Sequence, residues 1–108
     1  MKVSILGQKY IIRKLTDSEY PKLGKLEANG LAELYSKELI INSEMNPKSG
    51  QEYANFDDFE KKVIRHEIIH AFFHEAGLMD YCSDETLVDW LALQMPKIKK
   101  AMKDTNCI

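Results

Sequence analysis

The chain has 108 residues, which is enough for one domain of ordinary size and too few for several. Hydrophobic residues make up 44% and charged residues 30% of the chain, a composition that indicates a globular protein and excludes a disordered or fibrous one. The net charge of -2 gives no electrostatic sign of a nucleic-acid or anionic-membrane partner, and no apolar run reaches membrane length. We therefore expect a single domain over residues 1–108, monomeric and cytoplasmic, without a nucleic-acid or membrane partner.

The first half of the chain predicts strands. Lys2 to Leu6 and Lys9 to Leu15 are β-branched runs separated by a Gly-Gln pair, which is typical of a hairpin. Thr16 to Asn29 contains a proline and a glycine, so any helix in it should be short and interrupted. Leu31 to Tyr35 and Lys37 to Asn42 predict two further strands.

The second half predicts helices after a loop over Ser43 to Asn55, which we expect to form one rim of a cleft. One helix should begin after Asn55 as its cap and end at about Gly77. A last helix should begin after Ser83 as its cap, and Pro96 should kink or restart it. Strands followed by helices predict the α+β class, with a sheet of about three to four strands packed on the first long helix and a C-terminal helix.

His66, Glu67 and His70 form the pattern His-Glu-x-x-His inside the first long helix. At about 100° per residue the two histidines lie about 40° apart on one face, so both imidazoles can bind one ion. Glu67 projects from the adjoining flank, where it can reach a water on that ion as a general base. The alternative is a pair of core or surface histidines with a chance glutamate between them. The helical setting argues against that, as do the apolar flanks Phe59, Val63, Ile69 and Phe73.

A third metal ligand must come from another part of the chain, and Glu85 is the best candidate. Asp89, one turn later on the same face, is placed to accept the second ring N–H of a liganding histidine. First-turn acidity that stabilises the helix N-terminus is the alternative explanation for both residues. Asp84 and Asp80 are rivals for the metal. Cys82 is another possible ligand, although a lone cysteine is more often a small apolar residue.

His74 extends the histidine series, but it lies about 12 Å along the helix axis from His66, too far for both to bind one ion. We expect His74 to form a hydrogen-bonded wall or rim of the site, and an exchange of ligands or a second metal is the alternative. An enzyme at this site would also need a donor that stabilises an oxyanion. Four side chains are chemically able to act as that donor, namely His74, Tyr81, Tyr53 and Tyr35.

The motif as a whole resembles the zincin metallopeptidases whose third ligand is a glutamate followed four residues later by an aspartate. The residues that carry this likeness are His66, Glu67, His70, Glu85 and Asp89. Within the zincins, the short link between the helices and the ending Trp90 to Pro96 look most like the ImmA/IrrE family, including its small members encoded by phages and integrated elements. The likeness covers Leu39 to Pro96.

This resemblance implies a minimal zincin fold in which a small sheet packs on the active-site helix and one edge strand lines the cleft. Lys37 to Asn42 is the segment that would be this edge strand, where it could pair with an extended peptide. The chain departs from the family at Asp89, where an asparagine is common, and in its N-terminal half, which has no matching motif.

Motif and resemblance together predict a zinc-dependent endopeptidase acting on a cytoplasmic protein or peptide. One Zn²⁺ per chain would be held by His66, His70 and Glu85, with Glu67 as the catalytic base and Asp89 behind a liganding histidine. The alternative is a binding or regulatory module that keeps the metal for stability alone, although such a module has no need of Glu67. A different metallohydrolase, such as a nuclease or an amidase, is a third possibility, and the lack of a basic groove disfavours nucleic acid as its substrate.

Overall fold

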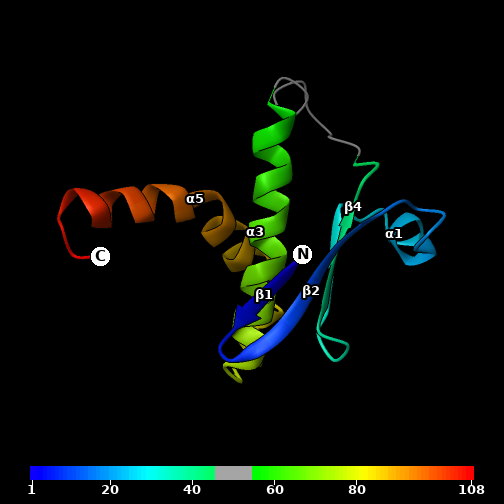
Figure 1. Cartoon of the computed structure of the whole chain (residues 1–108), viewed down its shortest axis with the longest axis horizontal. Coiled ribbons are helices and arrows are strands. Elements are labelled where there is room, and N and C mark those ends of the chain that lie inside the picture. The colour runs from blue at the N-terminus through cyan, green and yellow to red at the C-terminus, as the bar shows by residue number, and fades with distance from the viewer. Residues whose placement is uncertain (46–54) are drawn as a thin grey trace.

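The computed structural model describes residues 1–45 and 55–108, which form an α+β fold (Figure 1). The elements follow the predicted order of strands before long helices. They are strands β1 (Lys2–Ile5) and β2 (Gln8–Leu15), helix α1 (Pro21–Lys25), strands β3 (Gly30–Glu33) and β4 (Glu38–Asn42), and helices α3 (Phe56–Glu75), α4 (Met79–Cys82) and α5 (Glu85–Asp104). The predicted α+β class, with a small sheet and C-terminal helices, is confirmed. The loop predicted over 43–55 falls mainly on residues 46–54, outside the described residues.

The four strands form one mixed sheet in the order β1-β2-β4-β3. The predicted hairpin of β1 and β2 is antiparallel, and it turns through Leu6 and Gly7, whose φ angles of 48° and 85° match the right-handed twist of the strands. β3 and β4 form a second antiparallel pair, and β2 joins the two pairs by running parallel to β4.

The expectation that Lys37 to Asn42 forms the edge strand is wrong. β4 occupies this range and is hydrogen-bonded on both sides, by β2 and by β3. Its run Leu39, Ile40 and Ile41 is fully buried, as a central strand covered on both faces should be. Within residues 1–45 and 55–108, β3 is therefore the strand with a free edge on this side of the sheet.

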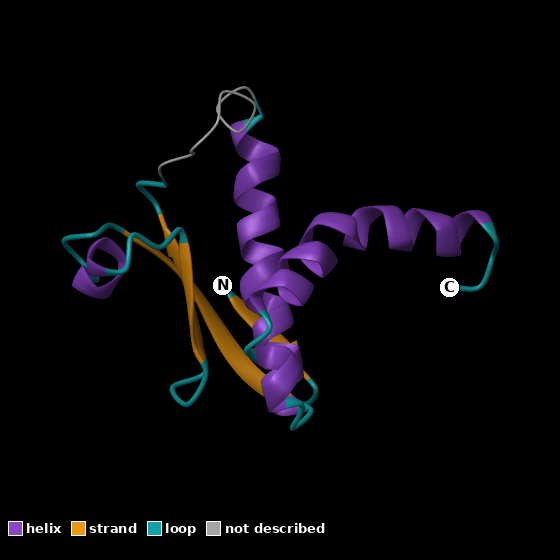
Figure 2. Cartoon of the chain, turned by 180° about the vertical axis from the view of Figure 1, so that it is seen from behind, coloured by secondary structure: helices purple, strands orange, loops and turns teal. Residues whose placement is uncertain are grey.

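Helix α3 covers one face of the sheet, and α1 lies on the other face (Figures 1 and 2). Because side chains alternate along a strand, Leu39 and Ile41 point toward α3, where they belong to the clusters that contain Ala71 and Val63. Ile40 points the opposite way and is also fully buried. The core is thus a layer between α3 and the sheet, with a smaller cluster between α3 and α5.

The helix ends differ from the predicted caps in detail. Asn55 occupies the N-cap position of α3, but its side chain makes no capping hydrogen bond. Ser83 ends α4, and its hydroxyl donates to the carbonyl of Met79 at 3.1 Å, so its prediction as the cap of the last helix is wrong. Asp84 caps α5 instead, because its carboxylate accepts from the backbone N–H of Leu87 at 3.0 Å and its charge favours a helix N-terminus.

Pro96 lies inside α5, which bends but does not restart there and continues to Asp104 (Figure 2). Proline has no N–H, so the carbonyl of Ala92, four residues earlier, loses its partner within the helix. Arg65 of α3 replaces that partner, because its Nε donates to the Ala92 oxygen at 2.6 Å. Ala92 itself is fully buried against Ile69 and Val88. The side chain of Arg65 therefore joins the two long helices at the proline.

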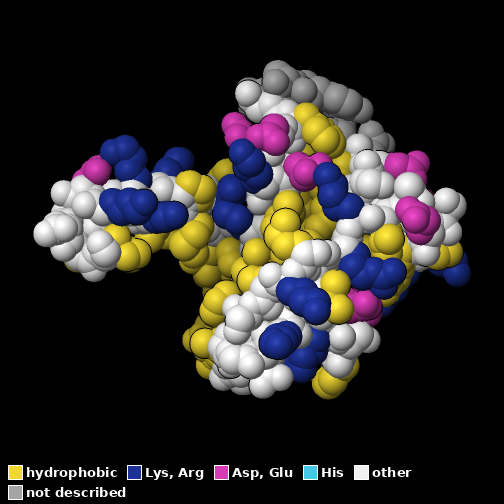
Figure 3. Space-filling view, viewed as in Figure 1, with side chains coloured by type: hydrophobic (Ala, Val, Ile, Leu, Met, Phe, Trp, Pro, Cys, Tyr) yellow, Lys and Arg dark blue, Asp and Glu magenta, His cyan; other side chains and the backbone are white. Residues whose placement is uncertain are grey.

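Beyond Pro96, α5 projects away from the rest of the molecule, and we call residues 96–104 the arm (Figures 1 and 2). Hydrophobic side chains gather in the corner between the arm and α3, and lysines lie along the arm (Figure 3). Across residues 1–45 and 55–108, no helix has both the length and the apolar character needed to cross a bilayer.

Replacing Arg65 with Met should leave the buried Ala92 carbonyl without a donor and lower the free energy of unfolding by about 1–3 kcal/mol. In a Pro96→Ala background the restored N–H can pair with this carbonyl, so Arg65→Met should cost much less there. Urea unfolding of the four proteins measures the coupling. Lys61→Met, one turn earlier in α3, is the control, since its side chain is 63% exposed. Additive effects of Arg65→Met and Pro96→Ala would contradict this role.

Candidate metal centre

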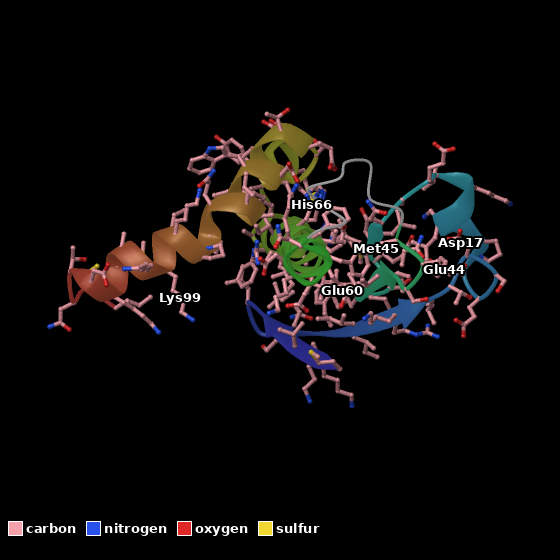
Figure 4. The ribbon with its side chains drawn as sticks, turned by 90° about the horizontal axis from the view of Figure 1, so that it is seen from above. Asp17, Glu44, Met45, Glu60, His66 and Lys99 are labelled. Carbon is pink, nitrogen blue, oxygen red and sulfur yellow. The ribbon has the colours of Figure 1, made fainter. Side chains whose placement is uncertain are left out.

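Three side chains from two helices converge at one point beside α3. His66 Nε2 and His70 Nε2 lie 3.2 Å apart. Glu85, the first residue of α5, places Oε2 3.0 Å from His66 Nε2 and Oε1 2.9 Å from His70 Nε2. His66 lies on the side of α3 next to the beginning of α5 (Figure 4). Within the described residues, these three form the one group whose donor atoms can share a metal ion.

In each histidine ring, the hydrogen bond made by the outer nitrogen, Nδ1, determines whether the inner nitrogen, Nε2, carries a proton or can accept. His70 Nδ1 lies 2.7 Å from the carbonyl oxygen of Cys82, which can only accept, so Nδ1 carries the proton. His66 Nδ1 lies 3.3 Å from Asp89 Oδ1. Burial raises the pKa of Asp89, but its hydrogen bonds with Lys62 and His66 outweigh burial and lower the pKa overall. Asp89 is therefore a carboxylate that accepts from His66.

With both outer nitrogens donating, the two Nε2 atoms and the Glu85 carboxylate are all acceptors. Burial lowers the pKa of His70, which favours the neutral ring that a metal ligand must have. In a tetrahedral zinc site with ligands at about 2.0–2.1 Å, ligand atoms lie about 3.3 Å apart, close to the distances of 2.9–3.2 Å found here. Three converging acceptors need a cation, so the chemistry of this donor set fits a metal ion.

Glu67 is buried beside this group, with 6% of its surface exposed. Burial, and secondarily the negative charge of Glu85, raises the pKa of Glu67 to about 8. A bound dication would oppose that rise, because its charge favours the carboxylate. β3 leaves just enough room for Glu67, since a Cβ added at Gly30 would lie 2.9 Å from Glu67 Oε2 and 3.1 Å from Val63 Cγ1.

His66, His70 and Glu85 could hold a metal ion, and we call them the metal-binding group. This group opens into a cavity of about 420 Å³ between β3 and α4. Its walls are mainly apolar and include Leu31, Leu34 and Met79. A second cavity, of about 220 Å³, adjoins Gly30 and is lined in part by Lys62 and Asp89. Gly30, His66 and Glu67 line both cavities, so the group lies where the two meet.

The rival acidic ligands lie elsewhere. Asp84 is engaged as the cap of α5, and Asp80 lines a separate cavity with Gly77 and Tyr81. The Cys82 thiol donates to the carbonyl of His70 at 3.3 Å, so it does not point to the metal-binding group. Cys82 contributes its backbone oxygen instead, which orients His70.

Three of the predicted wall and oxyanion residues, His74, Tyr81 and Tyr35, are not among the described residues that line the larger cavity. His74 packs edge-on against Tyr35 at 5.4 Å, and within the described residues its buried Nδ1 has no hydrogen-bond partner. Tyr81 packs against Phe73, with ring centroids 5.9 Å apart. Tyr53 lies outside the described residues.

Gly30 and Lys62 belong to the site and were missed from the sequence. Gly30 carried a detectable signal, because glycine in a strand often marks a close approach of another group. Lys62, whose Nζ lies 3.0 Å from Asp89 Oδ1, is indistinguishable in sequence from a solvated helix lysine. The role of the Cys82 carbonyl could not be predicted from the sequence, because every residue has a backbone oxygen.

Comparison of the chain with protein-family models, curated proteins and solved structures gave no match. The likeness to zincins and to the ImmA/IrrE family therefore stays a prediction from the motif. The geometry of the described residues stands independently of it: three acceptors, a buried carboxylate and an adjoining cavity.

Glu85→Gln should weaken Zn²⁺ binding by about 100-fold or more, because it removes the one anionic ligand of three. Asp89→Asn should weaken binding by about 10- to 100-fold, since it loosens the orientation of His66. Calorimetric titration with Zn²⁺ against a competing chelator measures both. Asp80→Asn is the matched control and should bind as the parent does. An equal loss in Asp80→Asn, or a parent chain indifferent to zinc, would refute the site.

Proposed function

We propose that this protein is a zinc-dependent metallopeptidase that hydrolyses a peptide bond in a protein or peptide. The observation that supports this best is Glu67, a carboxylate buried beside a three-acceptor group and lining the same cavity. A buried carboxylate is costly to keep in a small domain, so its position calls for a chemical reason. A general base beside a metal supplies that reason.

His66, His70 and Glu85 would hold the ion, and Asp89 and the Cys82 carbonyl would orient the two imidazoles. Zinc bound there would supply a Lewis acid that polarises the scissile carbonyl and makes water more acidic. Glu67 takes a proton from the attacking water, whose oxygen bonds to the carbonyl carbon. As the C–N bond breaks, Glu67 passes the proton to the leaving amine nitrogen.

The free edge of β3 is suited to hold the substrate. Among the described residues, β3 pairs with β4 on one side only, and its residues Gly30 to Ala32 line the cavity. An extended peptide can add to such an edge through backbone hydrogen bonds, which would bring one of its carbonyls to the metal-binding group. This assigns to β3 the role expected from the sequence for the neighbouring segment.

A binding module with a purely structural metal is less consistent with these features. Structural zinc sites are closed by four protein ligands, whereas three side chains converge within the described residues, next to an open cavity. A structural ion also gives no role to Glu67. This geometry therefore supports a metallopeptidase better than a binding module.

Glu67→Gln should abolish turnover while leaving zinc content and folding intact, because the amide keeps the shape of the side chain but cannot take a proton. Zinc-loaded parent and variant would be incubated with an extract of the native host, and new peptide N-termini counted by mass spectrometry. Termini made by the parent should be absent with Glu67→Gln. The proposed metallopeptidase function is wrong if both proteins make the same new N-termini. It is also wrong if neither protein makes any while the variant keeps full biological activity.

Gly30→Ala should reduce turnover by about 100-fold without loss of zinc, because the added Cβ must displace Glu67 or β3. Gly24→Ala is the control, since a Cβ there meets only ordinary contacts of 3.5 Å with Asp17. The measurement is the rate of cleavage of a peptide identified with the parent protein, alongside zinc content. Full activity of Gly30→Ala would show that the position of Glu67 is not critical.

A further inference from the structure

An apolar groove of about 420 Å³ lies between α3 and α5 and shares no lining residue with the two cavities at the metal-binding group. We call it the α3/α5 groove. It is lined by Ile68, Ile69, Phe72 and Phe73 of α3 and Leu91 and Met95 of α5, together with Arg65. Apart from Arg65 every lining side chain is apolar. Phe72 and Met95 are nevertheless 42% and 38% exposed, so this apolar surface faces solvent.

The apolar surface continues along the arm. Leu91, Met95, Ile98 and Met102 recur at spacings of four, three and four residues, which places them on one face of the helix. From Leu93 onward no described residue of α5 is buried. A helix as short as the arm has marginal stability without packing against another surface. A continuous exposed apolar surface marks an interaction site.

The charges around this surface favour an acidic occupant. Residues 97–108 contain four lysines and one acidic residue, Asp104, whose carboxylate already pairs with Lys100 at 2.7 Å. Lys99 and Lys103 follow Met95 by four and eight residues, so they lie beside the apolar face of the helix. Arg65 lies in the groove itself. A two-fold contact between two copies would set one cationic arm against the other, which is unfavourable.

The shape of the surface favours a helix over a membrane. A flat bilayer can touch the arm, but it cannot reach the floor of the groove, where Ile69 is 9% exposed. Side chains spaced along one face of a helix can enter such a groove. We propose that the α3/α5 groove and the arm bind an acidic amphipathic helix of a partner protein. Its apolar side chains would fill the groove and its carboxylates would face the lysines.

A synthetic 18-residue helix with leucines at heptad spacing and glutamates elsewhere is a direct probe. Fluorescence anisotropy should show that the full-length, zinc-loaded protein binds it, and that binding weakens with rising salt. The same peptide with lysine in place of glutamate should bind at least about tenfold more weakly, a difference of about 1.4 kcal/mol. Glu67→Gln should bind the acidic peptide as the parent does, so this proposal can fail or succeed independently of the metallopeptidase.

Met95→Glu and Leu93→Glu form a matched pair for locating the site. The two residues lie in the same helix, two positions apart and on opposite faces, and are 38% and 50% exposed. Met95→Glu should weaken binding of the acidic peptide by about tenfold or more, and Leu93→Glu by less than about twofold. Thermal melts would show that both variants are folded.

Four outcomes would overturn the proposal. They are no binding of the acidic peptide at about 1 mM, equal effects of the two variants, binding of anionic phosphatidylserine vesicles in place of the peptide, and a parent dimer in sedimentation that Met95→Glu dissociates. The last two would assign the surface to a membrane or to a second copy of the chain.

Discussion

The contact between α3 and α5 determines where the other functional parts of the molecule lie. The helices meet through Ile69, Val88 and Ala92, and Arg65 stabilises the junction by pairing with the carbonyl that Pro96 leaves free. On one side of this contact the first turn of α5 brings Glu85 to the two histidines. On the other side the same helix leaves the core. A single junction between helices thus positions both the candidate metal centre and the exposed apolar surface.

Helix α3 packs on the sheet, packs on α5 and carries most of the side chains of the candidate metal centre. Val63 and Ala71 pack on the sheet, and Ile69 packs on α5. The remaining buried positions, Glu67 and His70, are polar. Polar groups at such depth need partners, and those of the two histidines come from neighbouring elements through Cys82 and Asp89. Packing of the core and orientation of the site are therefore inseparable along this helix.

The parts of the fold and site that depend on local spacing were predictable from the sequence. The pairing of His66 with His70 is one such part, because both lie on one helix a turn apart. Which strand has a free edge was not predictable, because it depends on the parallel pairing of β2 with β4, which joins segments far apart in the chain. The same is true of Gly30 beside Glu67 and of Arg65 beside Ala92, where a contact across the fold gives an ordinary residue its role.

Since His66 and His70 belong to α3 and Glu85 begins α5, an ion held by all three would be a cross-link between helices. It would close a loop between His70 and Glu85 that contains α4. Folding and metal loading would then be one equilibrium, in which the ion favours the native state in proportion to how tightly it is held. Chelation would release the cross-link and so loosen α4 and the start of α5, the elements that form one wall of the larger cavity.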